Sequence, residues 1–315
     1  MRCVILDDYQ GVALSYADWS VLDGVEVSAL REHLDGEDRV VAAVGDAEVL
    51  VVMRERTPLT RALLERLPGL RLVVTSGMRN ASIDLAACRE RGVTVCGTAS
   101  ASTPPVELTW ALVLGLARHL VPEATAFSAG GPWQATVGRD LAGATLGLVG
   151  LGKIGTRVAA VGAAFGMDVA AWSPHLTPER AVAGGARLVD KRTLFAASDI
   201  VSLHLVLSDA TRGIAGREEL AAMRPSSYLV NTSRAGLVDT DALVEALRTG
   251  RIAGAGLDVH DAEPLPADHP LRGLPNVLGT PHLGYVSEGN YRRYFSEAVE
   301  DVAAWLAGRP VRELR

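Results

Sequence analysis

The chain of 315 residues contains one glycine-rich turn that limits its possible folds more than any other segment. A short apolar run, 146–149, leads into Gly150-x-Gly152-x-x-Gly155, and apolar residues at helical spacing follow. This order is typical of a unit in which a dinucleotide pyrophosphate rests on the free amides of a helix N-terminus. The first glycine permits the tight turn, the second leaves room for the phosphate, and the third lets helix and strand pack closely. The turn alone also fits another nucleotide-like ligand, such as S-adenosylmethionine.

Strands and helices alternate on both sides of this turn. Before it, short apolar runs predict five strands, at 2–6, 25–30, 48–53, 70–75 and 93–96. After it, strands are predicted at 168–172, 200–203, 228–231, 253–259 and 277–279, and a long helix at 288–306. Such alternation predicts an α/β fold whose parallel sheets are covered by helices.

Composition excludes several classes of function. The formal net charge is −6, which disfavours general binding to nucleic acid or to an anionic membrane. The three cysteines are an odd number without C-x-x-C spacing, so neither a disulfide framework nor a zinc site is predicted. No apolar stretch approaches the 18 residues of a membrane span, and the N-terminal apolar run is too short for a signal peptide. We therefore expect a cytoplasmic protein without a metal.

Three polar residues follow predicted strands after the turn, namely Arg234, Glu263 and His282. Ligands of an open parallel sheet bind outside the carboxyl ends of its strands, so these side chains could converge there. Arginine offers a bidentate fork to a carboxylate, and histidine is the natural proton donor near neutral pH. A nearby carboxylate would favour the protonated imidazole and orient the ring. Each residue taken alone is more often a solvated surface residue or a structural hydrogen-bonder.

The residue that usually selects between NAD and NADP is of an uncommon type in this chain. An acidic residue commonly follows the second strand of such a unit and binds the ribose hydroxyls, but here Ser173 stands in that place. A serine can bond either a hydroxyl or a phosphate. The nearest downstream arginine, Arg180, is not where a 2′-phosphate is usually bound. NAD and NADP both remain open, with NAD slightly favoured.

Four ordered motifs together resemble one family. They are the glycine turn, Asn231-Thr-Ser-Arg234-x-Gly236-x-Val-Asp239, Leu257-Asp-Val-x-x-x-Glu263-Pro-Leu and Thr280-Pro-His282-x-Gly284. In this order and spacing the chain resembles the D-isomer-specific 2-hydroxyacid dehydrogenases over nearly its whole length. That family includes phosphoglycerate dehydrogenases, glyoxylate/hydroxypyruvate reductases and D-lactate dehydrogenases.

The resemblance implies two Rossmann-like domains with parallel sheets. A flavodoxin-like substrate domain would comprise residues 1–98 and 285–315, and a Rossmann NAD(P)-binding domain, 99–284, would be inserted in it. The protein would form a homodimer. Hydride would pass between NAD(P)H and a 2-oxo acid or D-2-hydroxy acid, with His282 as proton donor or acceptor. Glu263 would hold His282 protonated, and Arg234 would bind the substrate.

The resemblance also implies further contacts. Cofactor contacts would come from Thr103, Gly150, Gly152, Lys153, Ile154, Gly155, Ser173, Leu205, Thr211, Thr232 and Asp258. Substrate contacts would come from Ser76, Gly77 and Arg234, with the Ser76–Gly77 turn supplying backbone amides. Beyond the resemblance, Arg54 and Arg79 could bind a second anionic group of the substrate or be ordinary surface arginines, and Tyr285 could also contact the substrate. The chain departs from the family at Ser173, in the substrate loop around Met78 and Arg79, and at Tyr285, which could narrow the pocket.

Two alternatives share this fold. Formate dehydrogenases pair their histidine with a glutamine, which Glu263 argues against. Dinucleotide-sensing corepressors retain all three polar residues, so these residues alone do not separate a binding protein from an enzyme. The chain has no basic or low-complexity tail of the kind that such a sensor could use, and this favours the enzyme.

Overall fold

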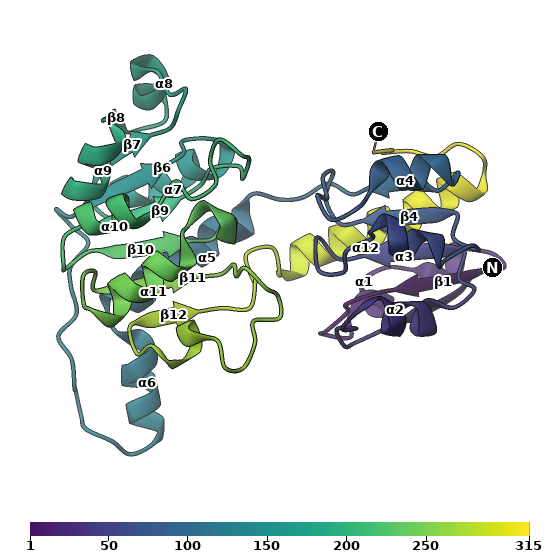
Figure 1. The fold of residues 1–315 in the computed structure, drawn as a ribbon, viewed down its shortest axis with the longest axis horizontal. Coiled ribbons are helices and arrows are strands. Elements are labelled where there is room, and N and C mark those ends of the chain that lie inside the picture. Colours follow the sequence, from purple (N-terminus) through teal and green to yellow (C-terminus); the bar gives the residue numbers. More distant parts are fainter. Residues whose placement is uncertain (315) are drawn as a thin grey trace. The chain divides into compact units, whose positions relative to one another are not determined.

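The computed structural model describes residues 1–314, which form two compact units (Figure 1). Unit 1 consists of Met1–Ala101 together with the segment from Ser287 on, and unit 2 is Ser102–Val286. Unit 1 is therefore built from both ends of the chain. No helix in the described part of the chain combines the length and the apolar character that crossing a membrane requires.

Unit 1 is a parallel five-stranded sheet in the order β2-β1-β3-β4-β5. Its strands are β1 (Arg2–Ile5), β2 (Glu26–Ala29), β3 (Val49–Val52), β4 (Leu72–Thr75) and β5 (Thr94–Gly97). Its helical segments are α1 (Ala13–Tyr16), η1 (Trp19–Val21), α2 (Glu37–Val44), α3 (Arg61–Glu65), α4 (Leu85–Glu90) and α12 (Glu288–Leu306). This strand order is that of flavodoxin-like sheets.

The centre of unit 1 is buried on both faces of the sheet. Every residue of β3 and β4 is buried, as expected of strands covered by helices on both sides. The C-terminal segment closes the far edge, because the Leu314 amide donates to Val95 O (2.8 Å) and the Gly97 amide donates to Arg312 O (3.0 Å). The chain thus returns after unit 2 to complete the first sheet.

Unit 2 is a parallel seven-stranded sheet in the order β12-β11-β10-β9-β6-β7-β8. Its strands are β6 (Thr145–Val149), β7 (Asp168–Trp172), β8 (Arg187–Leu188), β9 (Ile200–Leu203), β10 (Tyr228–Asn231), β11 (Gly254–Leu257) and β12 (Val277–Gly279). Its helices are α5 (Thr103–Ala117), α6 (Leu120–Ser128), α7 (Lys153–Ala164), α8 (Pro178–Ala183), α9 (Lys191–Ala197), α10 (Arg217–Ala222) and α11 (Thr240–Arg248), with short 3-10 turns η2 (Ala235–Leu237) and η3 (Pro270–Gly273).

Two hydrophobic clusters cover the two faces of this sheet. Along β10, Leu229 belongs to one cluster and Val230 to the other, because successive strand residues point to opposite faces. Helices α5 and α7 contribute to the Val230 cluster, and α9, α10 and α11 contribute to the Leu229 cluster. The sheet is therefore the middle layer of a three-layer unit.

The predicted α/β class with parallel sheets is confirmed. Strands β7, β9, β10 and β12 and helix α12 have the predicted bounds. The segments absent from the prediction are α1, η1, α6, α8, β8, η2 and η3. All of them except α6 are six residues or shorter, which gives too little periodicity to read. In α6 no residue is buried, so its apolar side chains mark no inward face.

Candidate active site

The glycine turn lies where β6 meets α7, and each glycine has a different local constraint. Gly150 has φ +105°, and a Cβ there would lie 2.7 Å from His204 O. A Cβ on Gly155 would collide with Gly150 O. Gly152 is the N-cap of α7, and apart from its chain neighbours no protein atom lies within 4 Å of the position that its Cβ would take. The middle glycine therefore borders an open cradle in front of the helix amides, as a pyrophosphate requires.

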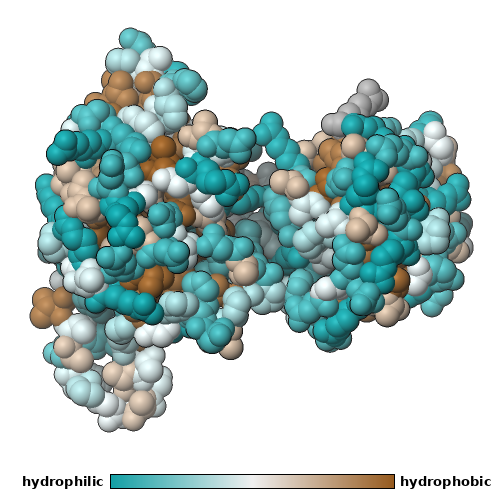
Figure 2. All heavy atoms as spheres, viewed as in Figure 1, coloured by the Kyte–Doolittle hydropathy of each residue, from teal (hydrophilic) through white to brown (hydrophobic). Residues whose placement is uncertain are grey.

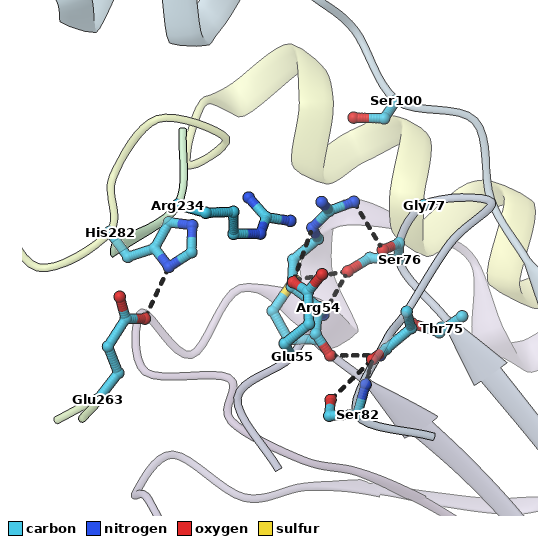
Figure 3. A network of polar contacts seen from close by, with 12 residues as sticks. Arg54, Glu55, Thr75, Ser76, Gly77, Ser82, Ser100, Arg234, Glu263 and His282 are labelled. Carbon is cyan, nitrogen blue, oxygen red and sulfur yellow. Dashed lines mark hydrogen bonds and ion pairs between the residues drawn. The ribbon is translucent and has the colours of Figure 1, made fainter. Parts of the chain in front are cut away.

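Arg234, Glu263 and His282 follow β10, β11 and β12, which are neighbours in the sheet. Because all these strands are parallel, their carboxyl ends meet at one edge, which also carries the glycine turn. His282 Nδ1 lies 2.7 Å from Glu263 Oε2, and Figure 3 shows the ring facing this carboxylate. The structure thus joins two of the three polar residues directly.

Glu263 is held at both carboxylate oxygens. Oε2 contacts His282, and Oε1 accepts the backbone N–H of His260 (2.9 Å). Partial burial acts to raise the pKa of this carboxyl, but the hydrogen bond and charge of His282 and the His260 amide outweigh it, so the pKa lies below its ordinary value. Glu263 is therefore poised as a carboxylate against the imidazole.

Asp258 fixes the loop that carries His282. Its Oδ1 accepts from the Leu283 amide and from Thr280 Oγ1 (2.6 Å each), and its Oδ2 accepts from the Gly284 amide (2.8 Å). Burial raises the pKa of Asp258, and these hydrogen bonds oppose the shift. The side chain is fully buried. We expected Asp258 to contact the cofactor. In the structure its side chain lies inside the protein and supports the loop that carries His282.

Tyr285 lies against His282. The two rings meet edge to face with centroids 5.2 Å apart, and Tyr285 is only 7% exposed. We expected this tyrosine to narrow the substrate pocket. In the structure the buried tyrosine packs on the edge of the imidazole, and its contact with substrate stays a prediction.

The turn after β10 positions Arg234. Asn231 Nδ2 donates to Arg234 O (2.9 Å), and Ser233 Oγ donates to Leu205 O (2.7 Å), which ties this turn to the segment after β9. Arg234 Nη1 donates to the Ser233 carbonyl (2.8 Å). The arginine therefore projects from a backbone that hydrogen bonds hold on both sides.

The remaining expected cofactor contacts surround the same sheet edge. Ser173 directly follows β7, whose last carbonyl, Trp172 O, accepts the Gly150 amide (2.8 Å). Two hydroxyls already have protein partners, since Thr232 Oγ1 bonds Thr109 Oγ1 (2.8 Å) and Thr103 Oγ1 accepts from Arg157 (2.9 Å). The others are Lys153 and Ile154 in the first turn of α7, Leu205 after β9, and buried Thr211, whose hydroxyl donates to Val206 O (2.7 Å).

The expected substrate contacts in unit 1 follow β3 and β4. Arg54, with φ +52°, donates from its amide to Ser76 Oγ (2.9 Å) and from Nη1 to Ser76 O (3.3 Å), contacts that Figure 3 draws as dashed lines. The Ser76 amide donates to Val52 O (3.1 Å) and the Gly77 amide to Thr98 Oγ1 (3.0 Å). We expected this turn to supply backbone amides to a substrate carboxylate, and in the structure the Ser76 and Gly77 amides both have partners within the unit. Arg79 is exposed.

Two histidines of this edge were not singled out by sequence reasoning. His204 follows β9, its Nε2 lies 2.9 Å from Ser202 Oγ, and burial lowers the pKa of its ring to about 4. His260 follows β11 and contacts Thr280 O through Nε2 (3.0 Å). The available signal was position, since both stand just after a predicted strand, as the three singled-out residues do.

Comparison with known proteins supplies a family for this geometry. Residues 110–284 match the model described as "D-isomer specific 2-hydroxyacid dehydrogenase, NAD binding domain". The hydroxypyruvate reductase of Thermotoga maritima is 38% identical over 283 residues, 88% of this chain and 90% of that protein. The D-3-phosphoglycerate dehydrogenase of Methanocaldococcus jannaschii is 38% identical over 276 residues, 86% of this chain but 52% of that protein. The chain thus spans about half the length of the latter enzyme.

Solved structures agree with the whole described architecture. A phosphoglycerate oxidoreductase from Vibrio cholerae o395 superposes with a TM-score of 0.93 at 40% identity, covering 98% of this chain and 99% of that one. The formate dehydrogenase of a Granulicella species shares the fold at 28% identity with a TM-score of 0.81. The corepressor-like alternative receives no support from these relatives, whose names are those of dehydrogenases and reductases.

Proposed function

The chain belongs to the D-isomer specific 2-hydroxyacid dehydrogenase family, and we propose that it interconverts a 2-oxo acid and the corresponding D-2-hydroxy acid with NAD(P)H. The observation that carries this proposal is the contact of 2.7 Å between Glu263 and His282. It lies at the sheet edge that also bears the glycine turn. A histidine held by a carboxylate can exchange a proton with a substrate oxygen while a hydride moves at the adjacent carbon.

The residues of unit 2 fit a bound dinucleotide. The cradle at Gly152 leaves the first amides of α7 accessible, so they and the turn would hold the pyrophosphate. Ser173, at the end of β7, would lie toward the ribose. When bound, NAD(P)H supplies the hydride that reduces C2 of the 2-oxo acid.

His282 would give its proton to the substrate. Its Nδ1 faces Glu263, so Nε2 is the ring nitrogen left to protonate the oxygen that becomes the hydroxyl. Glu263 stabilises the charged imidazole and fixes its orientation. In the reverse direction the same nitrogen accepts the hydroxyl proton.

Substrate carboxylate binding would fall to arginine and backbone donors. Arg234 offers the planar fork that suits a carboxylate. In unit 1, Arg54 packs on the Ser76–Gly77 turn, and we assign the next amide, that of Met78, to the substrate in place of the two that are already bonded. We propose unit 1 as the substrate domain and unit 2 as the coenzyme domain.

A homodimer is proposed from an unusually apolar surface on unit 2. Helix α6 has no buried residue, and its side chains include Leu120 (59% exposed) and Phe127 (71% exposed). Beyond the helix, Trp133 is 80% exposed and lies near Phe127, with ring centroids 6.1 Å apart and planes tilted by 50°. In Figure 2 this lobe, at the lower left, shows pale brown and white spheres among teal ones. Large exposed apolar groups gathered in one place indicate a protein interface.

The deciding experiment follows absorbance at 340 nm with the purified protein. NADH and NADPH are each offered with glyoxylate, hydroxypyruvate, pyruvate, phenylpyruvate and 3-phosphohydroxypyruvate. Oxidation of either cofactor establishes the reaction class and ranks both cofactors and substrates. Cofactor binding by fluorescence without oxidation of any substrate would contradict the proposed reaction for this group of acids.

The variant His282→Asn tests the proton donor. We expect turnover to fall by about 10²-fold or more, the usual scale for loss of general acid catalysis. Cofactor affinity, measured by the fluorescence of bound NADH, should stay within about twofold, because His282 is not assigned to dinucleotide binding. Unchanged turnover would rule out His282 as the donor.

A further inference from the structure

We propose that His260 is a positioning residue for the proton donor, a role that rests on the function proposed above for Glu263 and His282. His260 follows β11 in the segment Asp258-Val-His-Asp-Ala-Glu263. It contacts the segments that carry both members of the donor pair, and it does so with two different groups, its ring and its backbone amide.

The ring of His260 reaches the segment that precedes His282. Its Nε2 lies 3.0 Å from the carbonyl oxygen of Thr280. A carbonyl only accepts hydrogen bonds, so Nε2 carries the hydrogen and the tautomer is fixed. The same Thr280 oxygen accepts the backbone N–H of His282 (3.0 Å). One carbonyl thus connects the two histidines.

The backbone of His260 reaches the carboxylate of the pair. Its N–H donates to Glu263 Oε1 (2.9 Å), while Glu263 Oε2 meets His282 Nδ1 (2.7 Å). The four residues therefore form a closed ring of hydrogen bonds, which we call the His260 circuit: His260, Thr280, His282 and Glu263. Every member contacts two others in it.

The circuit has a specific structural task. His282 has a left-handed backbone, with φ +55°, which is uncommon for any residue other than glycine. Such a conformation persists only where surrounding contacts enforce it. Thr280 is itself anchored through its hydroxyl to Asp258, and Leu283 and Gly284 donate to the same carboxylate. Two groups of the circuit donate to the Thr280 carbonyl, the His282 amide and the His260 ring. Of these two, the His260 ring comes from the segment after β11, which also carries Glu263.

The environment of the other ring nitrogen supports the role of His260 in holding the Thr280 carbonyl. Nδ1 of His260 is buried and has no hydrogen-bond partner among residues 1–314. An unpartnered buried polar atom costs free energy, and a phenylalanine of similar size would avoid that cost. The contact from Nε2 to Thr280 is what a histidine gains over phenylalanine at this position.

The test compares His260→Phe with His260→Gln. Phenylalanine keeps the ring but removes the donor, whereas the amide of glutamine can place an N–H near the position of Nε2. We expect His260→Phe to lower kcat about 10-fold, because small displacements of a catalytic group have large effects on rate. The alkaline limb of its pH profile should move to lower pH, with KM and NADH affinity within about twofold. Glutamine should restore part of kcat.

The control is His269→Phe. His269 lies on the same connection between β11 and β12, where its Nδ1 accepts the Leu271 amide (3.3 Å) outside the circuit. This variant should keep the kcat and pH profile of the parent. If His260→Phe loses thermal stability but retains the kcat and the pH profile of the parent, His260 is merely structural and the proposal is overturned.

A spectroscopic measurement separates this proposal from the proposed function. In protein labelled with ¹⁵N-histidine, the Nδ1–H of His282 is identified as the signal lost in His282→Asn. We expect that signal to broaden or shift in His260→Phe and to persist in His269→Phe, whatever the substrate is. An unchanged signal in His260→Phe overturns the positioning role even if the enzyme reduces no acid tested. If His260→Phe does not fold, His260→Leu, which also removes the donor, takes its place: a shifted signal with lowered kcat in the folded variant supports the role, and an unchanged signal and kcat overturn it.

Discussion

At the scale of single residues, the site depends on charges that are fixed by hydrogen bonds. Glu263 is bound at both oxygens, and its pKa is lowered despite burial. Asp258 shows the opposite balance, since burial raises its pKa although three donors contact it. The charge of His282 acts on both carboxyls, and together with hydrogen bonds it outweighs burial at Glu263 but not at Asp258, which is fully enclosed. Glu263 is therefore suited to catalysis, and Asp258 to supporting the loop that carries His282.

The lowered pKa of Glu263 makes a prediction about stability and pH. A carboxyl with a lowered folded pKa stabilises the protein above its ordinary pKa of about 4.3, and this stability is lost as pH falls through the lowered value. We expect Glu263→Gln to reduce the free energy of unfolding at pH 7 by about 1–2 kcal/mol. The difference from the parent should shrink in urea titrations as pH is lowered from 7 to 3.

The matched control is Glu288→Gln. Glu288 forms an exposed pair with Arg292 at (i, i+4), and such pairs contribute little. This variant should stay within about 0.5 kcal/mol of the parent at both pH values. A Glu263→Gln deficit that persists unchanged at pH 3 would show that packing, rather than charge, is the cause.

At the scale of elements, the junction of β6 and α7 separates two roles of glycine. Gly150 and Gly155 are needed for the fold, because a Cβ on either would meet backbone atoms. Gly152 is different, with negative φ and open space around its Cβ position. Folding alone therefore does not require glycine at 152, whereas a closely bound phosphate does.

The variant Gly152→Ala tests this separation. We expect the melting temperature to change by no more than about 2 °C, since the added methyl group meets no protein atom. Affinity for NADH should fall at least about 10-fold, because the methyl group occupies the space of the phosphate. Thermal unfolding and NADH fluorescence titration measure the two effects.

Gly289→Ala is the control for that variant. Gly289 lies in the first turn of α12, again with no atom near its Cβ position. It should keep both stability and NADH affinity. Equal NADH affinity in Gly152→Ala and in the parent would show that the open space at Gly152 is not part of the dinucleotide site.

At the scale of the whole molecule, the chain order explains why the termini share one unit. Unit 1 is interrupted after Ala101 and resumes at Ser287 with α12, which packs on β4 and β5. Unit 2 lies between these segments in sequence and forms its own sheet. The exposed apolar groups of α6 belong to unit 2, so the proposed dimer would be built on that unit.

Phe127→Asp tests the dimer. A charge in a desolvated apolar contact is costly, so we expect the variant to be monomeric where the parent is dimeric, by light scattering at micromolar concentration. Val182→Asp, on α8, is the control, because Val182 is similarly exposed (75%) but lies outside the α6 surface. A dimer that survives Phe127→Asp, or a parent that is monomeric, would contradict the proposed interface.

The sequence by itself determined the class of fold and the identity of the polar residues. Strand β10 and helix α12 could be read directly, because β10 is a short, mostly apolar run and α12 carries a long helical pattern with clear ends. Arg234, Glu263 and His282 could be named because parallel strands bring their carboxyl ends to one edge. These inferences need only local periodicity and a rule of topology.

Only the tertiary structure decided how those residues are held. Burial of Tyr285, enclosure of Asp258 and use of the Ser76 and Gly77 amides all depend on neighbours remote in sequence. The His260 circuit likewise joins positions 260 and 280, which no periodic pattern relates. Hydrogen-bond partners are set by ångström-scale placement after the sheet has assembled. For this reason a sequence names the chemical groups of a site, and the fold determines which of them are available to a ligand.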